Sequence, residues 1–440
     1  MIINIHRGLE QIGGCITEIS TETSRVFIDM GQNLPGNGEQ TTPEQDKEMV
    51  EDIFRNNPKA HEAVVYTHAH EDHVGLFYYV PNNVPQYIGE GGREIFIAKF
   101  GLIKKGHELE YNVVSAVSAH NGSESQKQSC ERLAKTIDED KEKIHRLNSF
   151  RTWQRTKPHA LPQSFEVGDI RITPFFNCHS IYDSYMLLIE ADGKRIWHTG
   201  DYRMHGYMGK GLIPTLSRYA TDIDILITEG TMLSRDEECI NECIVSRKMA
   251  SVMDAFKYVV VLASATDIER LAAIKEAAKK AHKDLYICSG YMKRTMQIFT
   301  RREAEASKGL FSFHPKYVGY KNAEIPALPT MRKKGFVLIS GVMQQTFVKE
   351  LCEELDPSES SWDGYYKDPE QVRVNPRYKM FRDAFQNVVD IHTSGHADRK
   401  TIKQVIETVN PKEAIIGIHK DKGQTLESLN LSEEFMNKIV

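Results

Sequence analysis

Short apolar runs separated by turn residues dominate the N-terminal part of the chain. The runs that have the length and composition of strands are residues 2–6, 15–19, 26–29, 63–66, 84–88, 170–176, 184–189 and 195–198. Glycines at positions 13, 14 and 31 lie between the first of these runs, where turns are needed. This pattern predicts that most of the N-terminal part is β-sheet.

From about residue 92 to residue 158 the pattern changes, because charges of both signs become dense and apolar residues take helical spacing. Leu133, Ile137, Ile144 and Leu147 fall close to one face of a helix. The turn residues at 121–123 interrupt the segment, which predicts a helical hairpin. Because the charges are mixed, we interpret it as a solvated arm or lid rather than as a nucleic-acid clamp.

Apolar runs alternate with helical stretches from residue 206 to residue 385, and strand-like runs return after that. Such alternation is typical of a parallel α/β sheet. We therefore predict an α/β protein in three parts. Residues 1–205 form the first part with the arm, residues 206–385 an inserted α/β domain, and residues 386–440 a closing segment that rejoins the first part. Residues 356–376 are predicted to be an irregular connection.

A cluster of polar residues follows the apolar run at 63–66. It contains four candidate metal ligands, His68, His70, Asp72 and His73. Beyond the end of an extended strand, His68 and His70 point to the same side, because side chains repeat every second residue. Asp72 and His73 come where the chain is predicted to turn into a helix at 74–79, so they can face a second point nearby. Two ligand pairs aimed at adjacent points are what a dinuclear metal site needs.

Imidazole and carboxylate ligands suit zinc, and manganese or iron can replace it. The alternative is a chance cluster of histidines on a surface loop. That alternative does not explain why ligand type, spacing and strand-to-helix context agree. The sequence therefore predicts a metal site.

Further candidate residues lie beyond the ends of later apolar runs. They are His179, Asp201, His396 and His419. A lone histidine in such a place is usually solvated. With an incomplete metal shell upstream, ligation becomes the better interpretation for His179 and Asp201. A chain that returns to its first part after a long insertion can bring His396 and His419 to the same metals.

Two residues near these candidates are interpreted as structural. Asp29 closes a strand immediately before Met30-Gly31, and we expect it to hold the metal-binding loop from behind rather than to bind metal. His198 lies inside a strand, two residues before Gly200, and is expected to have a structural role only.

Length and composition limit the class of protein but leave the substrate open. The 440 residues are 40% hydrophobic, enough for proper cores, and contain no apolar stretch long enough to span a membrane. No basic leader precedes an apolar block, and seven irregularly spaced cysteines favour a reducing compartment, so we expect a cytoplasmic protein. Cys239 and Cys243 are interpreted as ordinary thiols. A net charge of −5 gives no sign of nucleic-acid binding, although a local basic groove stays open.

Two sets of motifs carry a resemblance to known families. Asp29, the cluster at 68–73, His179, Asp201 and a late histidine match the motifs of the metallo-β-lactamase superfamily. Glu229, His396 and His419, each after an apolar run, match those of its β-CASP branch of nucleases. That branch contains ribonuclease J, the pre-mRNA 3′-end cleavage endonuclease and Artemis-type DNA nucleases. The resemblance implies an αββα sandwich with an inserted α/β β-CASP domain, similar to ribonuclease J without its C-terminal domain.

The resemblance also implies a role for each candidate residue. His68, His70 and His179 would hold one zinc ion, Asp72, His73 and His419 a second, and Asp201 would bridge them. Asp72 would orient a metal-bound hydroxide or receive its proton. His396, paired with Glu229, would protonate the departing oxygen. The implied activity is hydrolysis of phosphodiester bonds in single-stranded RNA or DNA, with RNA favoured.

A substrate phosphate could lie at residues 263–267, where a strand passes into a helix. Helix N-termini offer free amide donors and a partial positive charge, and the candidate contacts are Ser264 and Arg270. The simpler interpretation of this stretch is a helix cap formed by Ser264, with Asp267 three residues on.

Two other functions stay open at this point. One is a metallohydrolase of a small ester, lactone or thioester, which would share the metal ligands but has no use for the Glu229–His396 pair. The other is a non-catalytic paralogue that binds RNA or a partner enzyme. The presence of the full ligand set counts against the latter. No membrane partner is expected, and the sequence does not reveal whether the protein is a homo-oligomer.

Overall fold

The computed structural model describes residues 1–35, 38–118, 123–154, 163–320, 324–356, 358, 360–364 and 376–440. Three predictions fall partly outside these residues: the hairpin turn at 121–123, the end of the arm at 158, and most of the irregular connection at 356–376. Within that connection the structure describes a strand, β16 (Ser360–Gly364). The described strands form three sheets of six strands each.

The first sheet is built from the N-terminal apolar runs. Its strands, in spatial order, are β1 (Ile2–Arg7), β2 (Ile16–Ser20), β3 (Ser24–Ile28), β4 (His61–Val65), β5 (Gln86–Gly89) and β6 (Arg151–Trp153). β1 to β3 pair antiparallel, and β3 to β6 pair parallel. The carboxyl ends of β3, β4 and β5 therefore meet at one edge of the sheet, where the histidine cluster follows β4.

The second sheet combines segments that are far apart in the sequence. Its strands, in spatial order, are β18 (Ala414–Ile418), β11 (Ile225–Glu229), β10 (Lys194–His198), β9 (Ser184–Ala191), β8 (Ile170–Asn177) and β7 (Phe165–Val167). β11 pairs parallel with both β10 and β18, so these three strands end at the same edge. Asp201, Glu229 and His419 lie at or just after the ends of these strands, so the pairing places them along one edge of the sheet.

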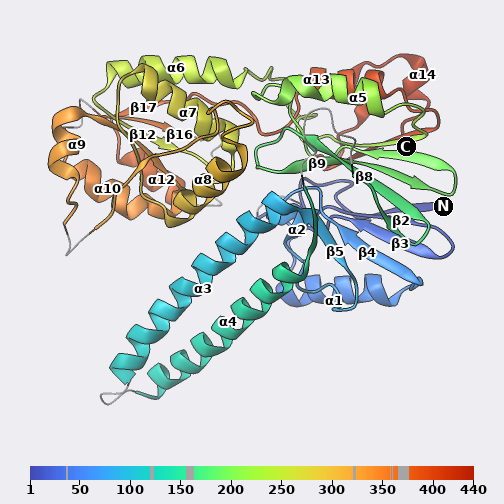
Figure 1. Ribbon diagram of the computed structural model, residues 1–440, viewed down its shortest axis with the longest axis horizontal. Helices are drawn as coiled ribbons and strands as arrows, with labels where there is room; N and C mark the ends of the chain where they lie inside the picture. The colour runs from blue at the N-terminus through green and yellow to red at the C-terminus, as the bar shows by residue number, and fades with distance from the viewer. Residues whose placement is uncertain are drawn as a thin grey trace.

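The two sheets pack face to face, with helices outside them (Figure 1). Val26 and Val65 of the first sheet share a buried cluster with Ile172, Leu187 and Ile196 of the second. The outer helices are α1 (Pro43–Arg55) and α2 (Glu71–Val74) on the first sheet and α5 (Leu212–Tyr219), α13 (Arg399–Val409) and α14 (Glu433–Met436) on the second. The order of layers is that of the αββα sandwich predicted from the sequence.

A helical hairpin projects from the first sheet between β5 and β6 (Figure 1). It consists of α3 (Glu90–Ser118) and α4 (Glu124–Ser149), so the predicted arm is present in the described part of the chain. Leu133, Ile137 and Leu147 are buried along α4, as their spacing indicates. His107 Nδ1 of α3 lies 2.7 Å from Asp140 Oδ2 of α4, and this contact joins the two helices.

The third sheet lies beside the sandwich, and all its pairings are parallel (Figure 1). Its strands, in spatial order, are β14 (Lys316–Tyr317), β13 (Leu285–Ile287), β15 (Phe336–Ser340), β12 (Tyr258–Leu262), β16 and β17 (Asn387–Val389). One face packs on α6 (Glu242–Ala255), α7 (Ile268–Lys280) and α8 (Gly290–Glu303), and the other on α9 (Leu328–Lys334), α10 (Gln345–Glu353) and α12 (Pro376–Asp383). We call this sheet and its helices the α/β unit.

The predicted boundaries of the inserted domain, 205/206 and 385/386, do not follow the sheets. α5 and β11 come after residue 205 but belong to the sandwich, because β11 pairs with two strands of the second sheet. β17 comes after residue 385 but pairs with β16 in the third sheet. Local patterning could not show this, since short apolar runs look alike whichever sheet they join.

A buried ionic cluster joins the α/β unit to the sandwich. Arg203, from the segment after β10, donates to Asp267 at 2.9 Å and to Glu269 at 3.1 Å, both at the start of α7. Its other terminal nitrogen lies 3.4 Å from Glu242 of α6. Burial acts against the charged guanidinium, but the three carboxylates outweigh it and hold the pKa of Arg203 well above its usual value. The two parts of the chain are therefore fixed to each other by charge.

Replacing Arg203 by alanine should destabilise the protein strongly. Removal of one partner from a buried ion pair leaves uncompensated charge and costs about 3–5 kcal/mol. Chemical denaturation should show that loss for Arg203→Ala. For the matched control Arg247→Ala, exposed on α6, it should show a change within about 0.5 kcal/mol. Equal stability of the two variants would contradict the structural role of the cluster.

Candidate metal centre

The histidine cluster is divided between the end of a strand and a short helix. His68 and His70 follow β4, and their rings are in contact, with His68 Nε2 3.1 Å from His70 Nδ1. α2 covers residues 71–74, so Asp72 and His73 lie on the helix itself. The prediction of a helix at 74–79 is therefore wrong, because the helix ends at Val74 and residues 75–79 form turns. A carboxylate in the first turn is favourable, because the helix N-terminus carries a partial positive charge.

Two strands of the second sheet bring His179 and Asp201 to this cluster. The Asn177 side chain donates to the backbone oxygens of Thr199 and Asp201, at 3.1 and 2.9 Å, and so ties the ends of β8 and β10 together. His179 Nε2 lies 3.2 Å from His70 Nδ1 and 3.6 Å from Asp201 Oδ2. Both residues therefore reach the histidine cluster.

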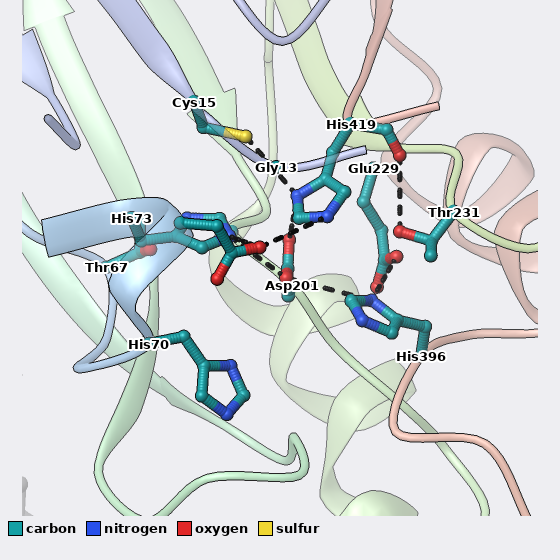
Figure 2. Close-up of polar contacts among 12 residues, drawn as sticks. Gly13, Cys15, Thr67, His70, His73, Asp201, Glu229, Thr231, His396 and His419 are labelled. Carbon is teal, nitrogen blue, oxygen red and sulfur yellow. Dashed lines mark hydrogen bonds and ion pairs between the residues drawn. The ribbon is translucent and has the colours of Figure 1, made fainter. Parts of the chain in front are cut away.

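His419 enters the site from the last strand of the second sheet. It follows β18 with a φ of +52°, a left-handed conformation that is uncommon outside glycine. Its backbone N–H donates to Gly8 O at 2.6 Å, which holds the turn against the N-terminal part of the chain. The His419 ring stacks on His73, and its Nδ1 lies 3.3 Å from Asp201 Oδ1 (Figure 2).

The carboxylate of Asp201 lies among these side chains (Figure 2). Asp201 Oδ2 is 3.1 Å from His73 Nε2 and 3.6 Å from His179 Nε2. Within the described part of the chain, the groups whose ligand atoms are close enough to share one ion include His68–His70–His179 and His68–His73–Asp201. The arrangement thus offers two neighbouring groups of ligands rather than one.

Three buried atoms of the site have no hydrogen-bond partner among the residues that the structure describes: His73 Nε2, Asp201 Oδ2 and His419 Nε2. Leaving a buried polar atom unpaired costs about 1–3 kcal/mol, so such atoms need a reason. All three are ligand atoms for divalent cations, and His419 Nε2 lies 3.7 Å from Asp72 Oδ2. The residues present therefore fit cations bound between them.

Burial keeps the first group of histidines in the form that binds metal. It lowers the pKa of His70 to about 4 and holds the pKa values of His68 and His179 well below the usual value for histidine. These rings are neutral near pH 7, and a neutral ring has a lone pair for a cation.

His73 and His419 behave differently from these three histidines. At His73 and His419 burial also acts against the charged form, but the negative charge of Asp201 outweighs it and raises the pKa of both rings. A cation that binds there must displace a proton, because only the neutral ring is a ligand.

Asp29 lies behind the histidine cluster, in the place expected for it. Its carboxylate accepts from Thr67 N at 2.7 Å and lies 2.7 Å from His73 Nδ1. A carboxylate on Nδ1 directs Nε2 into the site, which is the usual arrangement for a metal-binding histidine. His198, also interpreted as structural, accepts through Nδ1 from Gly200 N at 3.1 Å.

Glu229 and His396 form a pair beside Asp201 (Figure 2). Glu229 Oε2 is 2.8 Å from His396 Nδ1, and its other oxygen accepts from Tyr202 N at 2.7 Å. His396 Nδ1 is 3.7 Å from Asp201 Oδ2. The Glu229 side chain is 1% exposed and that of His396 21%, so the pair reaches from the buried ligands toward solvent.

Each of the two candidate substrate contacts has a polar partner within the protein. Ser264 Oγ hydrogen-bonds with Thr266 Oγ1 at 2.9 Å, and the N-cap of α7 is Asp267, so the predicted cap by Ser264 is wrong. Arg270 is buried, and its guanidinium donates to Glu242 at 3.1 Å. A phosphate could take this guanidinium only by leaving Glu242 buried and unpaired, which is costly. Sequence patterning gave no sign of Glu242, because it lies on another helix.

Cys15 belongs to the site although the sequence did not single it out. Its Sγ lies 3.3 Å from His419 Nδ1, and its side chain is buried. Cys15, His73 and His419 form a further group of ligand atoms close enough to share one ion. In the sequence, Cys15 follows a turn of two glycines before β2. Such a turn does not mark Cys15 as a site residue among the seven cysteines.

Comparison with known proteins gives a distant relative. No family model matches the chain. An RNase J-like protein of Methanocaldococcus jannaschii is 27% identical over 235 residues, which cover 52% of this chain and 42% of that protein. The chain therefore matches less than half of this relative's length. The match agrees with the resemblance to the metallo-β-lactamase superfamily that the motifs indicate.

Among solved structures, a protein of unknown function from Enterococcus faecalis V583 has a TM-score of 0.68 and 17% identity, over 100% of this chain and 97% of that chain. This likeness shows a shared fold. Zn²⁺-bound PqqB from Methylobacterium extorquens has a TM-score of 0.27 and 14% identity over 50% of this chain and 60% of that chain, which is too small a likeness to bear on fold or function. None of the described helices combines the length and apolar character of a membrane span.

Replacing Asp201 by asparagine should disturb both groups of ligands, because the amide lacks the charge that two neighbouring cations share. After dialysis against zinc and gel filtration, elemental analysis should find two ions per chain in the wild type and a loss of both tightly bound ions in Asp201→Asn. The control is Asp138→Asn on the arm, where the carboxylate is 74% exposed. Retention of two tightly bound ions by Asp201→Asn would refute the bridging role.

Proposed function

We propose that this protein is a nuclease of the β-CASP branch of the metallo-β-lactamase superfamily. It hydrolyses phosphodiester bonds of single-stranded nucleic acid with two divalent cations, zinc being the favoured metal. The observation that carries the proposal is the convergence on Asp201 of ligands from both ends of the chain, with the Glu229–His396 pair beside them. The α/β unit is proposed to be the β-CASP domain, inserted in the sandwich.

The cations would be held in two groups that share Asp201. The first group is His68, His70 and His179, and the second is Asp72, His73 and His419. Two bound cations supply a nucleophile from water at neutral pH and neutralise the charge of a phosphodiester. The buried ligand atoms of His73, Asp201 and His419, to which the described residues make no hydrogen bond, support this assignment.

The side chains of the protein would orient the reactants and move protons. Asp72, whose carboxylate is 12% exposed, would orient the attacking water or accept its proton. His396 would protonate the departing oxygen through Nε2, because its Nδ1 is held by Glu229. Glu229 thus fixes the tautomer of the ring.

Single-stranded RNA is the proposed substrate, ahead of DNA. The support is the RNase J-like relative, which this chain matches over 42% of its length. A small ester, lactone or thioester would use the same cations but would need no second proton donor. The pair of Glu229 with His396 therefore favours the nuclease.

His396→Ala should slow phosphodiester cleavage by about 10²- to 10⁴-fold, the usual contribution of a general acid, while two metal ions stay bound. Cleavage of end-labelled single-stranded RNA and metal content should be measured on the same preparation. His314→Ala, an exposed histidine of the α/β unit, is the matched control and should cleave at the wild-type rate. Unchanged cleavage by His396→Ala would remove His396 from the mechanism.

Salt should distinguish a polymeric from a small substrate. Binding of nucleic acid releases counterions, so cleavage of subsaturating single-stranded RNA should weaken as salt rises. The substrates to compare are end-labelled RNA and DNA, each with a 5′-phosphate or a 5′-hydroxyl. The product ladder shows which polymer is cleaved, in which direction, and whether cleavage depends on the 5′ end. Salt-independent turnover of a small ester, with no cleavage of any nucleic acid, would contradict the nuclease.

A further inference from the structure

Cys15 is held between the two ends of the chain that supply the second group of ligands. Its backbone N–H donates to Asp72 O at 3.0 Å, and its backbone oxygen accepts from Gly31 N at 3.0 Å. On the other side, Gly8 O accepts from His419 N, and a Cβ added at Gly8 would lie 3.2 Å from Cys15 Sγ. The position of the thiol is therefore fixed by backbone contacts on both sides.

The thiol of Cys15 lies beside Nδ1 of the His419 ring, and Asp72 lies on the side of Nε2. Cys15 Sγ is 3.3 Å from His419 Nδ1 (Figure 2). His419 Nε2 is buried, has no hydrogen-bond partner in the described part of the chain, and lies 3.7 Å from Asp72 Oδ2. An imidazole that binds a cation through Nε2 carries its proton on Nδ1, and this proton needs an acceptor.

We propose that Cys15 is a positioning residue for the second metal ion. Its sulfur accepts the Nδ1–H of His419 and so directs Nε2 toward Asp72. The inference rests on the metal centre of the proposed function. Asp201 Oδ1 is equally close to His419 Nδ1, at 3.3 Å, but that carboxylate also meets other histidines. When cations are bound to the Asp201 carboxylate, the sulfur of Cys15 is the acceptor left for the Nδ1–H of His419.

Direct ligation by Cys15 is the competing role, because its sulfur, His73 and His419 are close enough to share one ion. The two roles differ in what the side chain must supply. An acceptor for Nδ1–H can be sulfur or oxygen, so serine can replace cysteine. A thiolate ligand instead bonds to the metal through sulfur, and that bond gives a charge-transfer absorption band.

Zinc affinity, measured by competition with a chelator, tests the positioning role. Cys15→Ala removes the acceptor and should weaken the binding of one of the two ions about 10- to 100-fold, the usual cost of losing the outer partner of a metal ligand. The other ion should be unaffected. Cys15→Ser keeps an acceptor and should restore most of the affinity. Cys243→Ala, which removes an exposed thiol of α6, should bind both ions as the wild type does.

Cobalt(II) in place of zinc provides a second readout. A thiolate ligand would give an intense near-ultraviolet charge-transfer band, which we expect to be absent from the wild type. Unchanged affinity in Cys15→Ala, equal losses in the alanine and serine variants, or a charge-transfer band that Cys15→Ser abolishes would each overturn the positioning role. None of these results depends on cleavage. A protein that binds two ions but cleaves no nucleic acid would contradict the nuclease and leave the role of Cys15 intact.

Discussion

A single buried carboxylate, that of Asp201, is the constraint on which the site depends. Burial alone would raise its pKa, but the surrounding rings of His419, His73 and His396 hold that pKa well below the usual range. The carboxylate in turn keeps buried imidazoles together that would otherwise repel one another when charged. Cations bound between these groups would satisfy the buried ligand atoms of His73, Asp201 and His419 that have no hydrogen-bond partner in the described part of the chain.

Parallel strands supply the geometry that this constraint requires. β10, β11 and β18 end side by side, so Asp201, Glu229 and His419 meet although more than two hundred residues separate the first from the last. The backbone is strained directly after two strands of the sandwich, β3 and β18. Asp29 has a φ of +63° and His419 a φ of +52°, conformations that persist only where the surrounding structure fixes them. The packed cores of the sandwich offset that cost and hold the ligands in place before any cation binds.

The candidate ligands could be recognised in the sequence, whereas the partners of several residues could not. His68, His70 and His73 could be recognised because residue type and spacing are local properties. The sheet that β11 joins, the burial of Arg270 against Glu242, and the contact of Cys15 with His419 all depend on segments distant in the sequence. The start of α2 was misplaced because Asp72 and His73 are weak helix formers that the helix N-terminus nevertheless accommodates.

Anomalous diffraction at the zinc absorption edge, from crystals grown with zinc, tests the central claim most directly. The account predicts two peaks close to the Asp201 carboxylate, one beside His68, His70 and His179 and the other beside Asp72, His73 and His419. A single peak, or peaks away from Asp201, would contradict it.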